Sequence, residues 1–272
     1  MKPKTLLRIA SYTAADEFRS RGFLVLTIIS IAALVLLRGC FSGEVVVNGD
    51  KLNPAELGWH ASFIAFYFIS VVGMLMAVLI SMRLFRHERE NGSAVAILSG
   101  PVNRTEYLLG RSLGVWILSS VFMLVLHFTV FLIVLITVHA RIPGFLLASF
   151  ISTIAVLFLT QLVLALSLFT SDILSALVGI VVIVVSFISD SLYMVMRSDL
   201  AKQLIQNASE ANVAIWRVLW PKVGALQLYA VSIMQKNEFH SMGPVHPVFN
   251  LLIYVALLTV LLSWKFRREE IR

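Results

Sequence analysis

Charged side chains are scarce in this sequence: Asp, Glu, Lys and Arg make up 14% of its 272 residues. Hydrophobic residues make up 59%, and the mean hydropathy is +0.90. A soluble domain of this length cannot bury that much apolar surface in one core. The hydrophobic residues also stand in long runs, without the two-residue alternation of membrane strands. The composition therefore predicts an all-α membrane protein.

Cysteine is almost absent. The single Cys40 excludes an internal disulfide framework. The residues just before it resemble a lipoprotein cleavage site, which is one alternative for this region. However, Asp16 and Glu17 lie where a signal peptide is basic, Arg38 fits the cleavage site poorly, and five further hydrophobic runs follow. We therefore do not expect lipoprotein processing.

Catalytic motifs are also missing. No G-x-x-x-x-G-K-[ST] loop occurs, so we expect no ATP hydrolysis by this chain. His87-Glu88 begins like a zinc-protease helix, but Asn91 stands where the second histidine is required. The scattered Ser and Thr residues show no spacing that singles out a catalytic triad, and in membranes such residues usually hydrogen-bond neighbouring helices. We therefore expect the chain not to be an enzyme.

Six hydrophobic runs approach the roughly 20 residues that a spanning helix needs. They cover residues 22–39, 61–82, 113–138, 145–169, 173–189 and 248–264. We predict that 1–272 is a single transmembrane domain. Its other parts are an N-terminal helix (1–21), a loop between spans two and three (83–112), a helical loop before the last span (190–247) and a tail (265–272). The N-terminal helix is predicted to be amphipathic and interfacial, because Leu7, Ala10, Ala14 and Phe18 recur at helical spacing.

The distribution of basic residues predicts the orientation. With six spans, both termini lie on one side, and that side holds fourteen of the 22 Lys and Arg residues against eight on the other. The positive-inside rule then predicts that both termini and the 83–112 loop are cytoplasmic and that the 190–247 loop is outside. The expected location is the inner, or cytoplasmic, membrane of the cell. No loop combines a basic cluster with aromatics, so we expect no nucleic-acid partner.

The 83–112 loop is polar but punctuated. Gly92 suits a turn and Ser93 suits a helix cap, and a short apolar run follows up to Gly100-Pro101, which ends it. Asn103 with Glu106 has the pattern of a capping box that opens the next helix. The pattern predicts a short helix on the cytoplasmic surface to which a soluble partner can bind. Packing of this helix on the bilayer is the alternative.

This loop resembles the first cytoplasmic loop of permease subunits in the type-2 class of ABC transporters. Their pattern is an acidic pair, Gly-Thr or Gly-Ser, a short apolar helix, Pro, a basic residue and Gly-Lys. The matching residues are Glu88, Glu90, Gly92, Ser93, Ile97, Leu98, Pro101, Arg104, Tyr107, Gly110 and Arg111. Ser93 stands for Thr and Arg111 for Lys. The six-span layout, the amphipathic start and the large loop before the last span are similar as well.

The resemblance implies a membrane-spanning permease of an ABC exporter. A coupling helix at about 92–100 would dock on a separate P-loop ATPase subunit, and a second copy or a paralogue of the permease would complete the path. ATP and Mg would bind the partner, with no cofactor in this chain. Glu88 and Glu90 would serve the gate or the docking surface. Arg104 and Arg111 would bind acidic groups of the ATPase or lipid phosphate.

Few polar residues lie within the spans. His127 and Gln161 are therefore the candidates for a substrate path, although a neutral, hydrogen-bonding role is the stronger expectation for His127. In the 190–247 loop, His240, Met242 and His246 have the ligand chemistry of copper, while methionine is usually a packing residue, so no metal site is predicted.

Three other functions remain open. The chain would be a membrane anchor or assembly scaffold without a transport path, a permease for copper-enzyme maturation, or an intramembrane enzyme that acts on lipid. Co-purification of a P-loop ATPase separates the transporter from these alternatives. The sequence leaves the cargo, the direction of transport and the identity of the second permease open.

Overall fold

The computed structural model describes residues 3–42, 46–47, 50–51, 54–90, 103–137, 142–197, 219–235, 239 and 245–268. This part contains eight helices: α1 (Pro3–Phe18), α2 (Arg21–Ser42), α3 (Pro54–Glu90), α5 (Arg104–Thr137), α6 (Phe145–Ser167), α7 (Asp172–Arg197), α10 (Val223–Gln235) and α11 (Pro247–Arg268). Two short strands, β1 (Val46–Val47) and β2 (Asp50–Lys51), form an antiparallel hairpin between α2 and α3. The prediction of an all-α membrane protein is confirmed.

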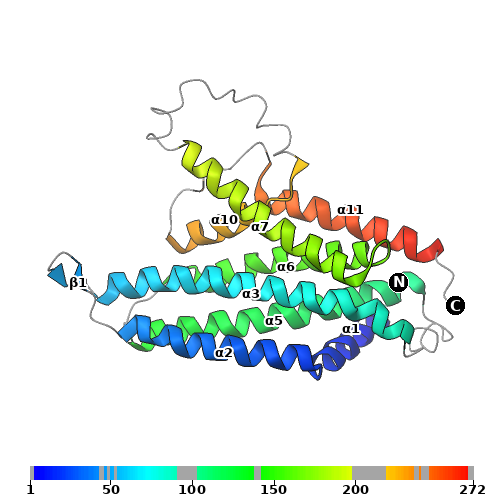
Figure 1. Ribbon diagram of the computed structural model, residues 1–272, viewed down its shortest axis with the longest axis horizontal. Helices are drawn as coiled ribbons and strands as arrows, with labels where there is room; N and C mark the ends of the chain where they lie inside the picture. Colours follow the sequence, from blue (N-terminus) through cyan, green and yellow to red (C-terminus); the bar gives the residue numbers. More distant parts are fainter. Residues whose placement is uncertain are drawn as a thin grey trace.

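The long helices lie side by side along one direction, and both termini are at the same end of the bundle (Figure 1). We call this the terminal end and the opposite one the distal end. Five of the described helices are long and apolar enough to cross a membrane, and α1 with α2 makes a sixth if this bent pair is counted as one span. The six predicted runs correspond to α2, α3, α5, α6, α7 and α11. The chain is thus a multi-pass membrane protein.

Helix α6 is the centre of the bundle and packs against α3, α5, α7, α10 and α11. Its buried side includes small residues such as Ala148, Ser152 and Ala155, which allow helices to approach closely in a membrane. The Ser149 hydroxyl donates a hydrogen bond to the Phe145 carbonyl of the same helix (2.8 Å), so its polar group is satisfied. Small side chains, and hydroxyl groups that hydrogen-bond within the helix itself, thus allow α6 to occupy the interior of the bundle.

Residues that favour turns or helix caps lie directly before three of the described helices. The Ser20 hydroxyl accepts a hydrogen bond from the Phe23 N–H (3.2 Å) and caps α2, where the chain turns by 68° from α1. Gly144 precedes α6 with φ +81°, and a Cβ there would lie 2.7 Å from the Ile233 carbonyl oxygen. The Ser171 hydroxyl accepts from the Leu174 N–H (3.4 Å) at the start of α7. Each boundary has a local cause that the sequence carries.

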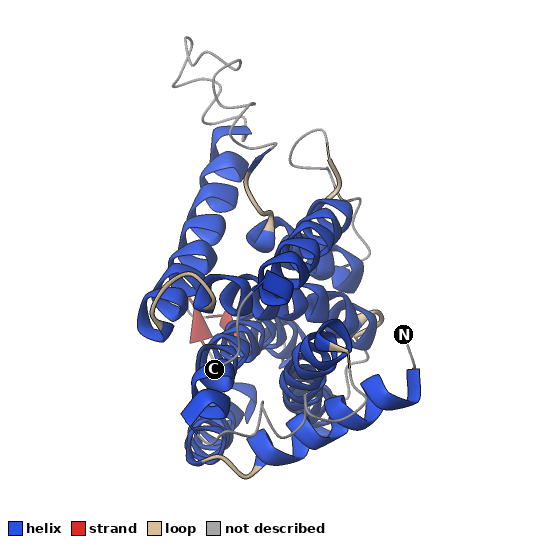
Figure 2. Ribbon diagram, turned by 90° about the vertical axis from the view of Figure 1, so that its right-hand side faces the viewer, coloured by secondary structure: helices blue, strands red, loops and turns tan. Residues whose placement is uncertain are grey.

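Helix α1 occupies the predicted N-terminal amphipathic segment and lies across the terminal end rather than along the bundle (Figure 2). Its buried residues are Ala10 and Thr13, and its main neighbour is α5. Such a crossing position is the one that an interfacial helix takes beside a membrane bundle.

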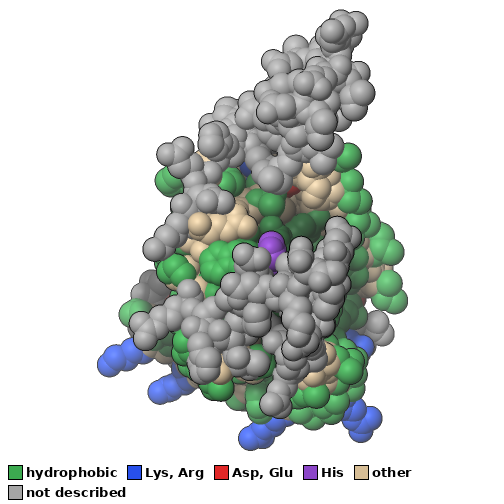
Figure 3. Space-filling view, turned by 90° about the vertical axis from the view of Figure 1, so that its left-hand side faces the viewer, with side chains coloured by type: hydrophobic (Ala, Val, Ile, Leu, Met, Phe, Trp, Pro, Cys, Tyr) green, Lys and Arg blue, Asp and Glu red, His purple; other side chains and the backbone are tan. Residues whose placement is uncertain are grey.

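The surface of the bundle is apolar along its length. Seen from the distal end, the described side chains are mostly hydrophobic, and the Lys and Arg side chains in view project at the lower edges (Figure 3). Among the five described helices that are long enough to span on their own, α7 and α11 are the least enclosed, and both expose large hydrophobic residues such as Ile173, Leu177, Ile253 and Leu257. Exposed hydrophobic faces of this extent suit contact with lipid or with other spans.

The chain before the last span differs from the predicted boundary. Helix α7 continues to Arg197, beyond the predicted end of the span at residue 189. Helix α10 then packs against α6 and α7, with Val223, Ala225, Leu226 and Ala230 buried. Part of the predicted 190–247 loop therefore belongs to the packed bundle.

Candidate functional site

The predicted coupling residues that the structure describes lie at the end of α3 and at the start of α5. Glu88 and Glu90 are in the last turn of α3. The predicted helix at 92–100 lies outside the described residues, and so do Gly92, Ser93, Ile97, Leu98 and Pro101. Helix α5 begins at Arg104, directly after Asn103, whose carbonyl accepts the Tyr107 N–H (3.0 Å). The helix start that the capping pattern predicts is therefore present.

Arg111 is buried in the contact between α1 and α5, with 3% of its surface exposed. Its Nη1 donates a hydrogen bond to the Thr13 hydroxyl (3.1 Å). Its guanidinium also lies over the rings of Tyr12 and Tyr107, at 5.8 and 5.7 Å from their centres. Cation–π contacts and hydrogen bonds to a charged group are each worth on the order of 1–2 kcal/mol when desolvated. In this conformation Arg111 holds α1 onto α5.

Two glycines bring the backbones of these helices together. A Cβ at Gly110 would lie 2.8 Å from Ile9 Cβ, and a Cβ at Gly114 would lie 2.5 Å from Thr13 Cβ and 2.6 Å from the Ala10 carbonyl oxygen. Only glycine permits this approach. Gly110 and Gly114 form a G-x-x-x-G pattern, which is the sequence signal that predicts close helix packing in membranes. The resemblance singled out Gly110 but not its partner.

Tyr107 extends the same contact to the last span. Its buried ring stacks with Phe266 of α11, with ring centres 6.3 Å apart and planes at 26°. The first two turns of α5 therefore contact α1 through Arg111 and α11 through Tyr107. We name this set of contacts, made by Tyr107, Gly110, Arg111 and Gly114, the α5 hub. Its first residue, Tyr107, lies five residues after the undescribed segment 91–102.

His127 lies in the interior of the bundle and is fully buried. Its Nε2 is 3.2 Å from the Phe66 carbonyl oxygen, and because a carbonyl only accepts, Nε2 carries the proton. The ring stacks on Phe66 (4.7 Å, 18°) and meets the edge of Phe145 (5.8 Å). His127 thus joins α3, α5 and α6 as a hydrogen-bonding and packing residue.

Gln161 joins α6 to α5. Its Nε2 donates to the Ser112 hydroxyl (2.5 Å), and both side chains are buried. Neither His127 nor Gln161 lines the cavity between α2 and α5 or the cavity at the bend between α1 and α2, which are both described below. Their role in a substrate path stays a prediction.

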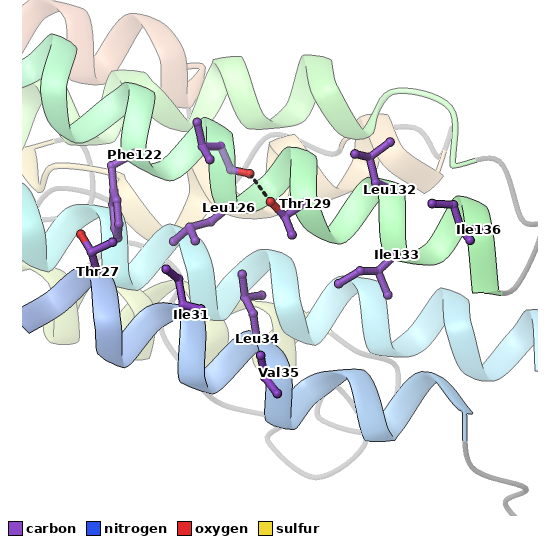
Figure 4. Close-up of a pocket in the computed structure, with 11 residues that line it drawn as sticks. Thr27, Ile31, Leu34, Val35, Phe122, Leu126, Thr129, Leu132, Ile133 and Ile136 are labelled. Atoms are coloured by element: carbon purple, nitrogen blue, oxygen red, sulfur yellow. Dashed lines mark hydrogen bonds between the residues drawn. The ribbon is translucent and has the colours of Figure 1, made fainter. Parts of the chain in front are cut away.

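A cavity of about 590 Å³ lies between α2 and α5 (Figure 4). Its walls are formed by Thr27, Ile31, Leu34, Val35, Phe122, Val125, Leu126, Thr129, Leu132, Ile133 and Ile136. Both threonine hydroxyls turn back to their own helices: Thr129 donates to the Val125 carbonyl (2.8 Å, dashed in Figure 4) and Thr27 to the Phe23 carbonyl (2.8 Å). The cavity therefore presents an apolar surface that suits acyl chains or other apolar groups.

Side chains of α7 and α11 hold the start of α10. The Ala225 N–H donates to Asp190 Oδ2 (2.6 Å) and the Gly224 N–H to the Ser186 hydroxyl (3.0 Å). The first N–H groups of a helix have no partner within it, and a carboxylate there also meets the favourable end of the helix dipole. The Lys222 N–H donates to Asn250 Oδ1 of α11 (3.0 Å). The sequence does not reveal this cap, because its partners are far apart in the chain.

Of the three residues with the ligand chemistry of copper, the structure describes only His246, and aromatic side chains surround it. His246 lies beside Tyr229, Phe239 and Phe249, with ring centres at 4.6, 5.7 and 6.1 Å. His240 and Met242 lie outside the described residues. Within the described ranges, no group of three or more His, Cys, Asp or Glu is placed to hold a metal ion.

The fold and the α5 hub define the class: a multi-pass helical membrane protein whose terminal end joins a crossing helix to the bundle. Residues 48–265 match the family described as ABC-2 family transporter protein, and the chain belongs to this family. No curated protein matches it. The chain is therefore a membrane permease subunit of an ABC transporter, which is not itself catalytic.

Proposed function

We propose that this chain is the permease of an ABC exporter in the cytoplasmic membrane, and that a separate P-loop ATPase drives it through residues 92–100. Family membership supports the permease role. The full sequence contains no phosphate-binding loop, which supports the proposal that ATP and Mg bind a separate subunit. A second copy or a paralogue would complete the translocation path.

The α5 hub is the observation that carries the coupling proposal. Any displacement of the 92–100 segment acts on the first turns of α5, where Gly110 and Arg111 hold α1 and Tyr107 contacts α11. Close-packed contacts transmit displacement because packed interiors do not deform continuously. ATP-driven closure of the ATPase would thus move α1, α5 and α11 together. In this proposal Glu88, Glu90 and Arg104 remain docking residues, whereas Arg111 acts within the chain.

The orientation is part of the proposal. The described basic side chains at the terminal end include Arg8, Arg19, Arg83 and Arg104, in keeping with a cytoplasmic location. Cys40 lies near the distal end of α2. A membrane-impermeant thiol reagent should therefore label Cys40 in intact cells, after permeabilisation of an outer membrane if one is present. If Cys40 is labelled only after lysis of the cytoplasmic membrane, the proposed orientation is wrong.

Co-purification tests the coupling. The tagged chain should retain a P-loop ATPase, and either deletion of residues 94–98 or Gly92→Val should release it while the chain stays in the membrane. Gly49→Val, between β1 and β2 in the sequence, is the matched control and should leave the ATPase bound. Unchanged ATPase recovery in both coupling variants would refute the docking role of this segment.

The α2–α5 cavity supports an apolar or amphipathic cargo. Its lining offers no charged group. The cargo class is tested by transport assays with reconstituted vesicles and by a Val125→Asp substitution, which places a carboxylate on the wall. We expect this variant to lose transport of an apolar cargo while it still binds the ATPase.

A further inference from the structure

A second cavity lies at the bend between α1 and α2, where these helices face α3. It has a volume of about 400 Å³. Its walls combine apolar side chains, among them Met76 and Leu79 of α3, with Arg21 of α2 and Arg83 of α3. The bend of 68° creates this space, because α1 leaves the bundle where α2 enters it. The lining therefore combines apolar side chains with two basic ones.

The two arginines are available for a ligand. Both are exposed, and the described structure gives neither of them a hydrogen bond or an ion pair. Arg83 lies one residue before the end of the apolar part of α3, Gly58–Leu84, and Arg21 is the first residue of α2. Both therefore lie at the depth where a spanning helix meets the headgroups. Glu17 lines the same cavity and has an interaction of its own, so the lining holds one carboxylate and two guanidinium groups.

We propose that this cavity binds an anionic phospholipid of the leaflet at the terminal end. The phosphate contacts Arg21 and Arg83, because guanidinium groups donate in a geometry that matches phosphate oxygens. An acyl chain lies against Met76 and Leu79. The apolar residues of the lining favour a lipid over free phosphate, because an inorganic ion would leave the apolar part of the cavity unfilled. A bound lipid bridges α2 and α3 and so fixes the angle between α1 and α2.

Gly22 offers a test that leaves the charges unchanged. It lines the cavity, and a Cβ at this position meets no atom within 4 Å. The Cβ of Gly22→Leu therefore meets no clash, the larger side chain takes up space in the cavity, and leucine is a better helix former than glycine. Arg21→Gln with Arg83→Gln removes the charges instead. The matched control is Arg8→Gln with Arg19→Gln, which removes the same charge from exposed arginines of the same end that do not line the cavity.

The experiment measures lipid binding to the purified full-length chain. Native mass spectrometry counts retained phospholipid, and titration with dioleoylphosphatidylglycerol, dioleoylphosphatidylcholine and inorganic phosphate follows after delipidation. We expect selective binding of the phosphatidylglycerol. The double Arg21/Arg83 variant should weaken it about 30-fold, because each arginine near an anionic membrane surface contributes about fivefold. Gly22→Leu should also lose retained lipid, whereas the Arg8/Arg19 variant should change affinity by no more than about twofold.

Three results would overturn the proposal. They are equal binding of the zwitterionic lipid, equal loss in the Arg8/Arg19 control, and full retention by Gly22→Leu. Tight binding of inorganic phosphate alone would likewise refute a lipid site. The proposal rests on the placement of the terminal end at a membrane surface and not on the ATPase. Failure of lipid binding with intact ATPase recovery, or the reverse, therefore separates it from the proposed function.

Discussion

Substitution by alanine should have opposite effects on stability at two glycines: Gly114, which lies in the contact between α1 and α5, and Gly22, which lies outside it. Gly114→Ala would put its Cβ 2.5 Å from Thr13 Cβ and 2.6 Å from the Ala10 carbonyl oxygen. One of these atoms belongs to the backbone, so α1 must move away as a unit. Overpacking of this kind costs about 1–3 kcal/mol, against a gain in helix propensity of up to about 1 kcal/mol. We expect a net loss of about 1–2 kcal/mol in the free energy of unfolding.

Gly22→Ala is the matched control, because its Cβ meets no atom within 4 Å. Only the propensity gain applies there, and we expect this variant to be more stable by about 0.5–1 kcal/mol. Unfolding of the purified protein in detergent, by heat or by denaturant, measures both. If α1 also transmits force, Gly114→Ala should in addition uncouple transport from ATP hydrolysis. Equal or greater stability of Gly114→Ala relative to Gly22→Ala would show that the helices do not approach as closely as described.

The remaining predictions concern buried polar contacts. Asp190→Ala should destabilise the protein by about 1–3 kcal/mol because it leaves the Ala225 N–H at the start of α10 unpaired; Asp172→Ala, at the exposed start of α7, is the comparison and should cost less. A double-mutant cycle of Gln161→Leu and Ser112→Ala should give a coupling energy of about 0.5–3 kcal/mol in unfolding experiments, and additivity within about 0.3 kcal/mol would contradict the hydrogen bond. Arg111→Lys should lose stability as well, because an ammonium group cannot keep the Thr13 contact and both ring contacts; a variant as stable as the original would refute the role of Arg111 in holding α1.

The membrane fold was predictable because hydropathy is a local property. Each span is a run of consecutive residues whose transfer from water to lipid is favourable on its own, so its position follows from the sequence without knowledge of its neighbours. The start of α5 after Asn103 and the start of α6 after Gly144 follow from turn and cap residues in the same way. The ABC-2 family was also within reach, because its motif occupies one short segment.

The role of individual polar residues required the tertiary structure. Arg111 is predicted from the resemblance to face a partner or a lipid phosphate, yet its guanidinium lies against α1, whose Thr13 is 98 residues away in the chain. The cap of α10 combines Ser186 and Asp190 with residues beyond Pro221. Hydropathy reports how deep a residue lies and says nothing of the direction in which its side chain points.

The sequence by itself determined the positions of the hydrophobic runs, the helical class and the family, since each depends on composition or on residues close together in the chain. Only the tertiary structure decided which face of each helix is buried, which cation holds α1 and which cations stay free beside a cavity. The physical reason is that side-chain contacts arise between helices that pack along different faces, and the rotation of each helix is fixed by all of its neighbours together.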